Sequence, residues 1–181
     1  IRDMFVENTP AASTVKVHIA AEGVKQATPL KLELRERGSN KVVWSRQEQM
    51  DGSEKTLTLS LPQAKLWSVE EPNLYELTAK LGNDELTQRF GFRWFEVRDV
   101  KGDRQFYLNG KRITLITAIS WSFWPDNGIT PSRELAYKQV RDAKQLGMNM
   151  LNFHRTIGNT DVLNAADELG LLYFEEPGGN Q

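Results

Sequence analysis

Residues 148–153 read Met-Asn-Met-Leu-Asn-Phe, a short apolar run that lies between two segments with helical spacing. The later segment, residues 160–169, repeats apolar side chains on one helical face and is followed by Gly170, a common helix end. Residues 171–174, Leu-Leu-Tyr-Phe, form the next apolar run. Strand, helix and strand in this order predict a right-handed crossover and a parallel sheet.

The same alternation extends toward the N-terminus. Thr130 and Pro131 are the expected N-cap and first residue of a helix that runs to Gly147. Residues 113–119 are predicted to form a largely apolar strand, after a hairpin whose type I′ turn is the Asn-Gly pair at 109–110. Three parallel strands and two helices leave sheet edges unpaired. This part is therefore expected to be the front of a larger domain, either a doubly wound sheet or a (β/α)8 TIM barrel.

The first half of the chain has apolar side chains at every second position. The clearest runs are residues 15–19, 30–34, 57–61 and 77–81. Period two with one polar face is typical of half-buried antiparallel strands. About seven such strands separated by turn clusters predict an immunoglobulin-like β-sandwich. We therefore predict two domains: the sandwich over residues 1–98, and three strands and two helices of an incomplete barrel over residues 99–181.

Composition and charge exclude several classes of function. Lys and Arg total 23 against 24 Asp and Glu, so no basic surface for nucleic acid is expected. The absence of Cys excludes disulfides and thiolate metal sites, and no apolar run approaches the roughly 20 residues of a membrane span. We expect no cofactor, no metal and no nucleic-acid or membrane partner. A start at Ile1, without an initiator Met or a signal-peptide pattern, suggests either that the chain begins within a longer protein or that its N-terminus has been processed.

Ligands bind at the carboxyl ends of strands in parallel α/β folds. After the first strand, Trp121 and Trp124 lie in an aromatic stretch that would either stack on the apolar face of a sugar ring or pack the loop onto the barrel rim. The second strand ends near Asn152, His154 and Arg155, which would either donate hydrogen bonds to ligand hydroxyls or brace the next loop. His154 has no second His or Cys at ligand spacing, so a metal site is not expected.

The third strand ends in Glu175 and Glu176. Because adjacent strand residues point to opposite faces, only one of these side chains can face the barrel interior, where it would contact a substrate or join a polar network. They cannot be the acid and nucleophile of a glycosidase, whose two carboxyl groups face each other across the scissile bond. We therefore assign no catalytic residue within this chain.

Five stretches carry a resemblance to a known family. They are residues 66–75, 90–93, 106–111, 147–151 and 167–172. In order and spacing they resemble glycoside hydrolase family 2, which contains β-galactosidases, β-glucuronidases and β-mannosidases. The resemblance implies a sugar-binding jelly-roll domain before this chain and the rest of the barrel after it. It also implies retaining hydrolysis of β-glycosides, by a general acid/base Glu after the fourth barrel strand and a nucleophilic Glu after the seventh.

Three stretches differ from the family pattern. Residues 117–121 stand where many members have Gly-x-Asn-x-His, and Asn152 stands where many have Arg. Residues 154–158 take the place of an Arg-Thr-Ser-His-Tyr-Pro-like run. These positions contact the sugar in relatives, so the resemblance does not specify which sugar is bound.

Three hypotheses follow from the sequence. The chain is a fragment of a β-glycosidase that is inactive alone, or it belongs to a non-catalytic carbohydrate-binding or assembly protein on this scaffold, or it is an unrelated interaction protein. Unpaired strand edges predict self-association of the isolated chain. A periplasmic or secreted location suits an enzyme that degrades polysaccharides.

Overall fold

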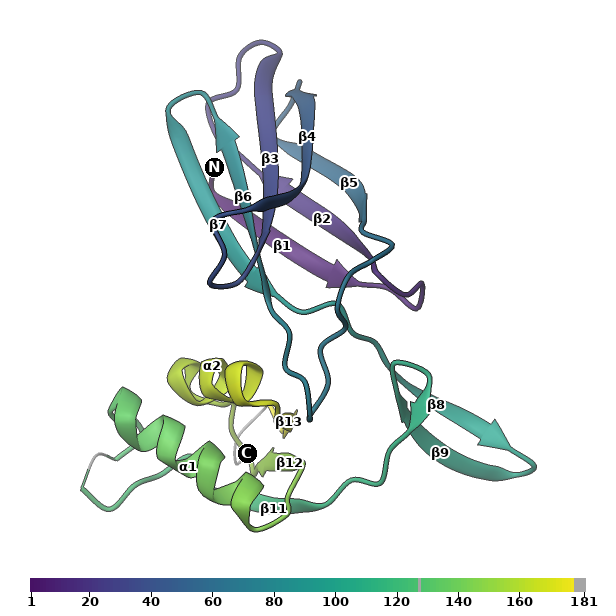
Figure 1. Cartoon of the computed structure of the whole chain (residues 1–181). Coiled ribbons are helices and arrows are strands. Elements are labelled where there is room, and N and C mark those ends of the chain that lie inside the picture. The colour runs from purple at the N-terminus through teal and green to yellow at the C-terminus, as the bar shows by residue number, and fades with distance from the viewer. Residues whose placement is uncertain (127, 178–181) are drawn as a thin grey trace. The chain divides into compact units, whose positions relative to one another are not determined.

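The computed structural model describes residues 1–126 and 128–177, and the chain divides into two units (Figure 1). Unit 1 contains residues 1–67, 73–96 and 108–110, and unit 2 contains residues 68–72, 97–107 and those from 111 onward. The domain boundary at residue 98 stays a prediction, and residues 178–181 of its second range lie outside the described part. Residues 68–72 and 97–98, which lie before that boundary, belong to unit 2, and residues 108–110, which lie after it, belong to unit 1.

Unit 1 is a sandwich of two antiparallel sheets with the strand orders β1-β2-β5 and β4-β3-β6-β7. The strands are β1 (Asp3–Asn8), β2 (Thr14–Ala20), β3 (Thr28–Glu36), β4 (Val42–Met50), β5 (Glu54–Ser60), β6 (Tyr75–Leu81) and β7 (Asp84–Phe90). Side chains from both sheets share one buried core. The period-two pattern is confirmed on β2, where Val15, Val17 and Ile19 are buried and Lys16 is exposed. The arrangement is that of an immunoglobulin-like sandwich.

Trp67 is fully buried, and several segments of unit 1 contact it. Its backbone N–H donates to the carbonyl of Phe92 (2.9 Å), and the guanidinium of Arg93 lies 4.2 Å from the centre of its ring. Gly91 is required beside it, because a Cβ there would lie 2.7 Å from the Trp67 Cβ. The side-chain amide of Asn109 donates to the Trp67 carbonyl (2.8 Å). Three of the stretches that carry the family resemblance therefore meet at this tryptophan.

A third sheet has the order β10-β9-β8. Its strands are β8 (Phe95–Val100), β9 (Asp103–Leu108) and β10 (Lys111–Arg112). The predicted Asn-Gly turn is confirmed, because Asn109 and Gly110 both have positive φ, 52° and 75°. Strand β7 ends at Phe90, and Phe92, two residues later, packs edge-to-face on Tyr75 with ring centroids 5.1 Å apart.

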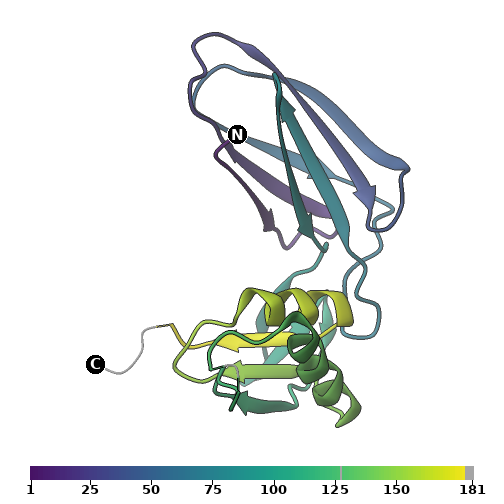
Figure 2. The same ribbon diagram turned by 90° about the vertical axis from the view of Figure 1, so that its left-hand side faces the viewer.

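The later part of unit 2 is a parallel sheet with two helices, and its strands run side by side in one direction (Figure 2). The elements are β11 (Thr117–Ser120), α1 (Arg133–Gln145), β12 (Met150–Phe153), α2 (Thr160–Leu169) and β13 (Leu172–Glu175). The predicted order of strand, helix, strand, helix and strand is confirmed. Its sheet order, β11-β12-β13, follows the chain.

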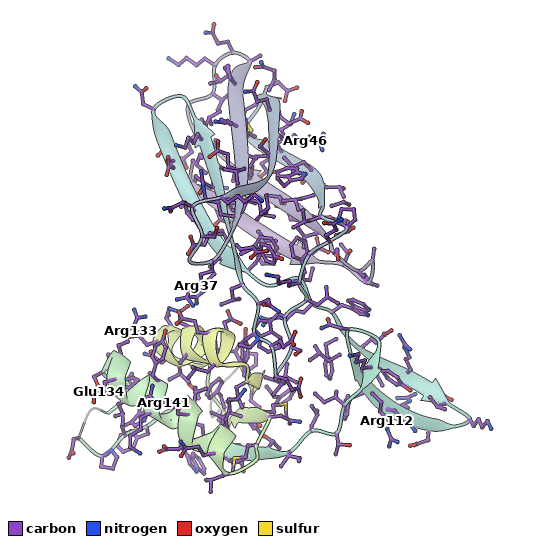
Figure 3. The ribbon with its side chains drawn as sticks, viewed as in Figure 1. Arg37, Arg46, Arg112, Arg133, Glu134 and Arg141 are labelled. Atoms are coloured by element: carbon purple, nitrogen blue, oxygen red, sulfur yellow. The ribbon has the colours of Figure 1, made fainter. Side chains whose placement is uncertain are left out.

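Both helices pack against one face of this sheet. Side chains from α1, α2 and β12 share a second buried core with Trp124 and with Leu171, which directly precedes β13. On α1 the buried side chains are Ala136, Val140 and Ala143, and Figure 3 shows charged residues such as Arg133 and Arg141 on its outer surface. Helical spacing of small apolar residues therefore determines which face of α1 is covered.

The opposite face of the sheet is largely apolar and open. Ile119 and Phe174 lie in register on either side of Asn152, and they are 59% and 53% exposed. Exposed apolar side chains on a sheet favour association with other surfaces. Self-association of the isolated chain stays a prediction. No helix within residues 1–126 and 128–177 is both long and apolar enough to cross a membrane.

The start of α1 differs from the prediction. The N-cap is Ser132, whose Oγ accepts a hydrogen bond from the backbone N–H of Leu135 (3.2 Å). Thr130 is therefore not the N-cap, and Pro131 precedes the helix. The helix therefore begins two residues later than the Thr-Pro pair predicts, because the Ser132 side chain supplies the acceptor for an unpaired N–H of its first turn.

The strand predicted over residues 113–119 is confined to β11. The reason is Asn149, whose side-chain amide replaces a neighbouring strand: it donates to the carbonyl of Thr114 and accepts from the N–H of Ile116, both at 2.8 Å. The Thr114 carbonyl and the Ile116 N–H are thus satisfied without a strand ladder.

Candidate functional site

The three parallel strands end together. Ser120, Phe153 and Glu175 are register partners at the carboxyl ends of β11, β12 and β13. The residues that directly follow them are Trp121, His154 and Glu176. Alternation places these three on the sheet face opposite the helices, the face to which Asn152 also belongs. We call Trp121, Asn152, His154 and Glu176 the strand-end cluster.

Glu176 is the centre of the strand-end cluster. Its Oε2 lies 3.2 Å from Nδ1 of His154 and accepts a hydrogen bond from the backbone N–H of Arg155 (3.2 Å). The side chain of Asn152 is also hydrogen-bonded to the carboxylate. The indole of Trp121 meets the imidazole of His154 edge-to-face, with ring centroids 4.6 Å apart. An aromatic ring, an imidazole, an amide and a carboxylate therefore form one continuous group.

These contacts lower the pKa of Glu176 below its ordinary value of 4.5. The largest cause is the hydrogen bond from the Arg155 backbone. The Asn152 side chain and electrostatic interactions with the His154 and Arg155 side chains act in the same direction, and desolvation opposes them. Glu176 is therefore ionised near neutral pH. In that state it accepts hydrogen bonds and does not deliver a proton.

Replacing Asn152 with alanine is expected to raise the pKa of Glu176 toward 4.5, because the charged form loses one hydrogen bond. Since the folded pKa lies below the unfolded one, ionised Glu176 stabilises the fold above about pH 4.5, and this contribution is lost as the pH falls through the folded pKa. The measurement is the Glu176 carboxyl chemical shift by NMR during acid titration. Glu7, whose pKa is lowered by His18 in unit 1, is the control that should not move. An unchanged Glu176 midpoint would contradict the role assigned to Asn152.

Asn152 also carries a polar atom that lacks a partner. Its Oδ1 is buried and makes no hydrogen bond to any residue that the structure describes. A buried acceptor without a partner costs roughly 1–3 kcal/mol. Asn152 therefore places a buried, unsatisfied carbonyl oxygen beside the Glu176 carboxylate.

Glu175 points to the other face of the sheet. Its Oε1 accepts a hydrogen bond from the backbone N–H of Gly158 (3.1 Å), in the loop between β12 and α2. The adjacent glutamates thus have different surroundings, as strand alternation predicts. Glu175 stabilises the loop that follows His154, whereas Glu176 belongs to the strand-end cluster.

The sequence model of glycosyl hydrolases family 2 matches residues 1–93, just over half of the chain. The chain belongs to glycosyl hydrolase family 2. A putative beta-glucuronidase of Formosa agariphila is 35% identical over 122 residues, which are 65% of this chain and 14% of that protein. A beta-galactosidase of Thermoanaerobacterium thermosulfurigenes is 35% identical over 127 residues, 67% of this chain and 17% of that protein.

Solved structures of other proteins share the fold. The beta-glucuronidase of Parabacteroides merdae superimposes with a TM-score of 0.77 at 24% identity, covering 96% of this family 2 chain and 23% of that one. Beta-glucuronidase 3 of Bacteroides uniformis gives a TM-score of 0.75 at 26% identity, covering 97% and 22%. The chain thus spans less than a quarter of the length of each of these four relatives.

The aromatic residues after β11 of this family 2 chain are of two kinds. Trp124 is only 8% exposed, packs in the core of unit 2 and exchanges two backbone hydrogen bonds with Gly128 (both 2.8 Å). Trp121 and Phe123 are 65% and 63% exposed. The sequence left two hypotheses for these residues. Trp124 packs its loop against the core, whereas Trp121 has an exposed ring on which a ligand could stack.

Arg155 lies next to the strand-end cluster in a left-handed conformation, with φ at 56°. Its backbone N–H donates to Glu176, and its side chain is exposed. Among the described residues there is no group of three or more His, Cys, Asp or Glu side chains that could hold a metal ion.

Sequence reasoning missed a polar cluster where β11 meets α1. Gln139 donates to Oγ of Ser120 (2.9 Å), and the backbone N–H of Ser122 donates to the same oxygen (3.3 Å). The signal that could have revealed it is spacing: Gln139 lies three residues after Ala136 and four before Ala143, on the buried face of the helix. A polar side chain at such a position needs a buried partner.

Proposed function

We propose that this chain is part of a family 2 enzyme that hydrolyses the O-glycosidic bonds of β-glycosides, and that the segment from β11 onward is the first part of its (β/α)8 barrel. Family membership and the names of the relatives support the activity. The observation that carries the site is the strand-end cluster, which lies at the carboxyl ends of three parallel strands. Barrel enzymes bind their substrates at this end of the strands.

The strand-end cluster offers the groups that recognise a sugar. The exposed indole of Trp121 suits stacking against the apolar face of a pyranose ring. The carboxylate of Glu176, which is held by the Asn152 side chain, accepts hydrogen bonds from hydroxyl groups. His154 is oriented by both Trp121 and Glu176. We propose that these residues, with Arg155, contact the substrate.

The proposed cleavage needs two further carboxylates. In a retaining glycosidase the acid and the nucleophile face each other about 5 Å apart. Glu175 and Glu176 point to opposite faces of β13, so they cannot form that pair. We propose that the whole protein supplies both catalytic groups outside this chain, and that these 181 residues alone do not turn over a substrate.

The test uses the whole protein with aryl β-galactoside and aryl β-glucuronide substrates. Glu176→Gln and His154→Ala are each expected to lower kcat/KM by roughly 10- to 100-fold, which corresponds to about 1.4–2.8 kcal/mol of lost transition-state stabilisation. The matched control is the His18–Glu7 pair of unit 1, which has a 2.8 Å contact and a neighbouring Phe5 ring. His18→Ala should leave kcat/KM unchanged. Equal losses in His154→Ala and His18→Ala, or no loss in either cluster variant, would sink the proposal.

A non-catalytic carbohydrate-binding protein is the second candidate, because the exposed Trp121 and the polar groups of the cluster suit binding as well as cleavage. It predicts that the whole protein binds sugars in calorimetry, that Trp121→Ala abolishes the binding, and that no β-glycoside is hydrolysed. Hydrolysis at a rate that depends on the strand-end cluster would exclude this candidate.

A further inference from the structure

One contact in unit 2 has no part in the proposed function. The chain leaves unit 1 after Trp67 and returns to it at Asn73, and residues 68–72 between them belong to unit 2. We call residues 68–72 the strap segment. Its first residues form a closed turn, because the N–H of Ser68 donates to the Glu71 carbonyl (2.9 Å) and the N–H of Glu71 donates to Ser68 Oγ (3.0 Å). The strap segment is therefore a locally ordered loop.

Lys144 connects the strap segment to both helices of unit 2. It lies in the last turn of α1, and its Nζ donates to the carbonyl of Val69 (2.6 Å) and to the carbonyl of Gly170 (2.8 Å), which follows α2. Burial lowers the pKa of the Lys144 ammonium, and the nearby Glu70 carboxylate opposes this shift. A partly desolvated ammonium that is hydrogen-bonded to two main-chain carbonyls joins the strap segment, α1 and the end of α2 at one point.

Gly170 makes the close approach of the strap segment possible. Its φ is 81°, and a Cβ at this position would overlap the carbonyl oxygen of Val69. Gly147, at the end of α1, has the same φ of 81° but has nothing within 4 Å of an added Cβ. Both helix ends therefore need a residue that accepts a positive φ, but only at Gly170 must the residue also lack a Cβ to leave room for the strap segment.

We propose that the strap segment is an integral part of the α/β fold, and that its contact with Lys144 controls whether the ends of α1 and α2 become ordered. The strap segment lies between β5 and β6 in the sequence, so the α/β part is not a self-sufficient folding unit that begins near residue 98. Loss of the Lys144 contact loosens the start of β13, because Gly170 directly precedes Leu171 and β13. The proposal concerns folding and does not depend on any glycosidase activity.

The first test is hydrogen exchange, followed by mass spectrometry, on the full 181-residue chain with Lys144→Met. Methionine keeps most of the side-chain volume and removes both hydrogen bonds. Exchange of the strap segment and α2 is expected to accelerate about tenfold or more, while β2 and β3 in unit 1 keep their protection. The matched control is Lys138→Met, on the same helix, where the lysine is exposed and pairs with Asp142. Equal effects of the two substitutions, or unchanged exchange in Lys144→Met, would overturn the proposal.

A second pair of variants covers the case in which Lys144→Met does not fold. Gly170→Ala and Gly147→Ala carry the same strain from positive φ, but only the first pushes against Val69. The strap segment is expected to lose protection in Gly170→Ala and to keep it in Gly147→Ala. If both variants protect the strap segment equally, Gly170 is needed only for its φ and the strap segment has no controlling role.

Discussion

Trp67→Ala is expected to lower the free energy of unfolding of the β-sandwich by about 3–5 kcal/mol, the usual cost of removing a large buried aromatic side chain. Trp67 is fully buried, and its ring also supports the guanidinium of Arg93 at 4.2 Å. Gly91 lies against the same side chain, so the backbone has little freedom to close the cavity from that side. The measurement is urea unfolding followed by far-ultraviolet circular dichroism.

Trp121→Ala is the control for this experiment. It removes the same side chain from a position that is 65% exposed, and its effect on stability should stay within about 0.5 kcal/mol. The comparison separates an aromatic residue that stabilises the fold from one that we assign to ligand contact. Similar losses of stability in both variants would show that Trp121 packs in a way that its exposure does not suggest.

Gly158→Ala is expected to destabilise unit 2 by about 1–3 kcal/mol and to displace the loop that carries His154. An added Cβ would lie 2.5 Å from the ring of Phe153 and 2.8 Å from Leu163, and neither of these packed side chains can move without disturbing the core. The displacement would also weaken the hydrogen bond from Gly158 to Glu175. Urea unfolding gives the stability change, and NMR shifts of His154 report the displacement of the loop.

Gly52→Ala is the matched control for Gly158→Ala. No atom lies within 4 Å of a Cβ added to Gly52, and its φ is not positive. The substitution should be neutral or stabilise the fold by up to about 1 kcal/mol, because alanine restricts the unfolded chain. If Gly158→Ala proves equally harmless and His154 does not move, the crowding at Gly158 is not a constraint on the site.

The order of elements could be predicted from the sequence because each depends on local periodicity. Alternation puts Val15, Val17 and Ile19 on one face of β2. Helical spacing puts Ala136, Val140 and Ala143 on one face of α1. Burial of such apolar faces is the main stabilising term in folding. The Asn-Gly turn at 109–110 could also be predicted, because few residue pairs accept two positive φ angles.

What could not be predicted depends on side chains that reach distant backbone. The shortening of β11 follows from Asn149, whose amide bonds to residues more than thirty positions earlier in the chain. The alternation rule showed that Glu175 and Glu176 must point to opposite faces, but not which of them would lie beside His154. That choice follows from the register of β13 on β12, in which Glu175 is the partner of Phe153. The strap segment had no signal in periodicity, because its contact with Lys144 is made by the main-chain carbonyl of Val69.

Because Glu175 and Glu176 point in opposite directions, the number of residues in β13 decides which glutamate lies beside His154. Side-chain direction in a strand has a period of two, so removal of one codon within β13 would turn Glu176 toward the helices and bring Pro177 to the position beside His154. Both glutamates would still be encoded, and a comparison by sequence identity would score the variant as nearly unchanged. At this edge of the sheet, in-frame deletions and insertions are therefore the genetic changes to which the site chemistry is most sensitive.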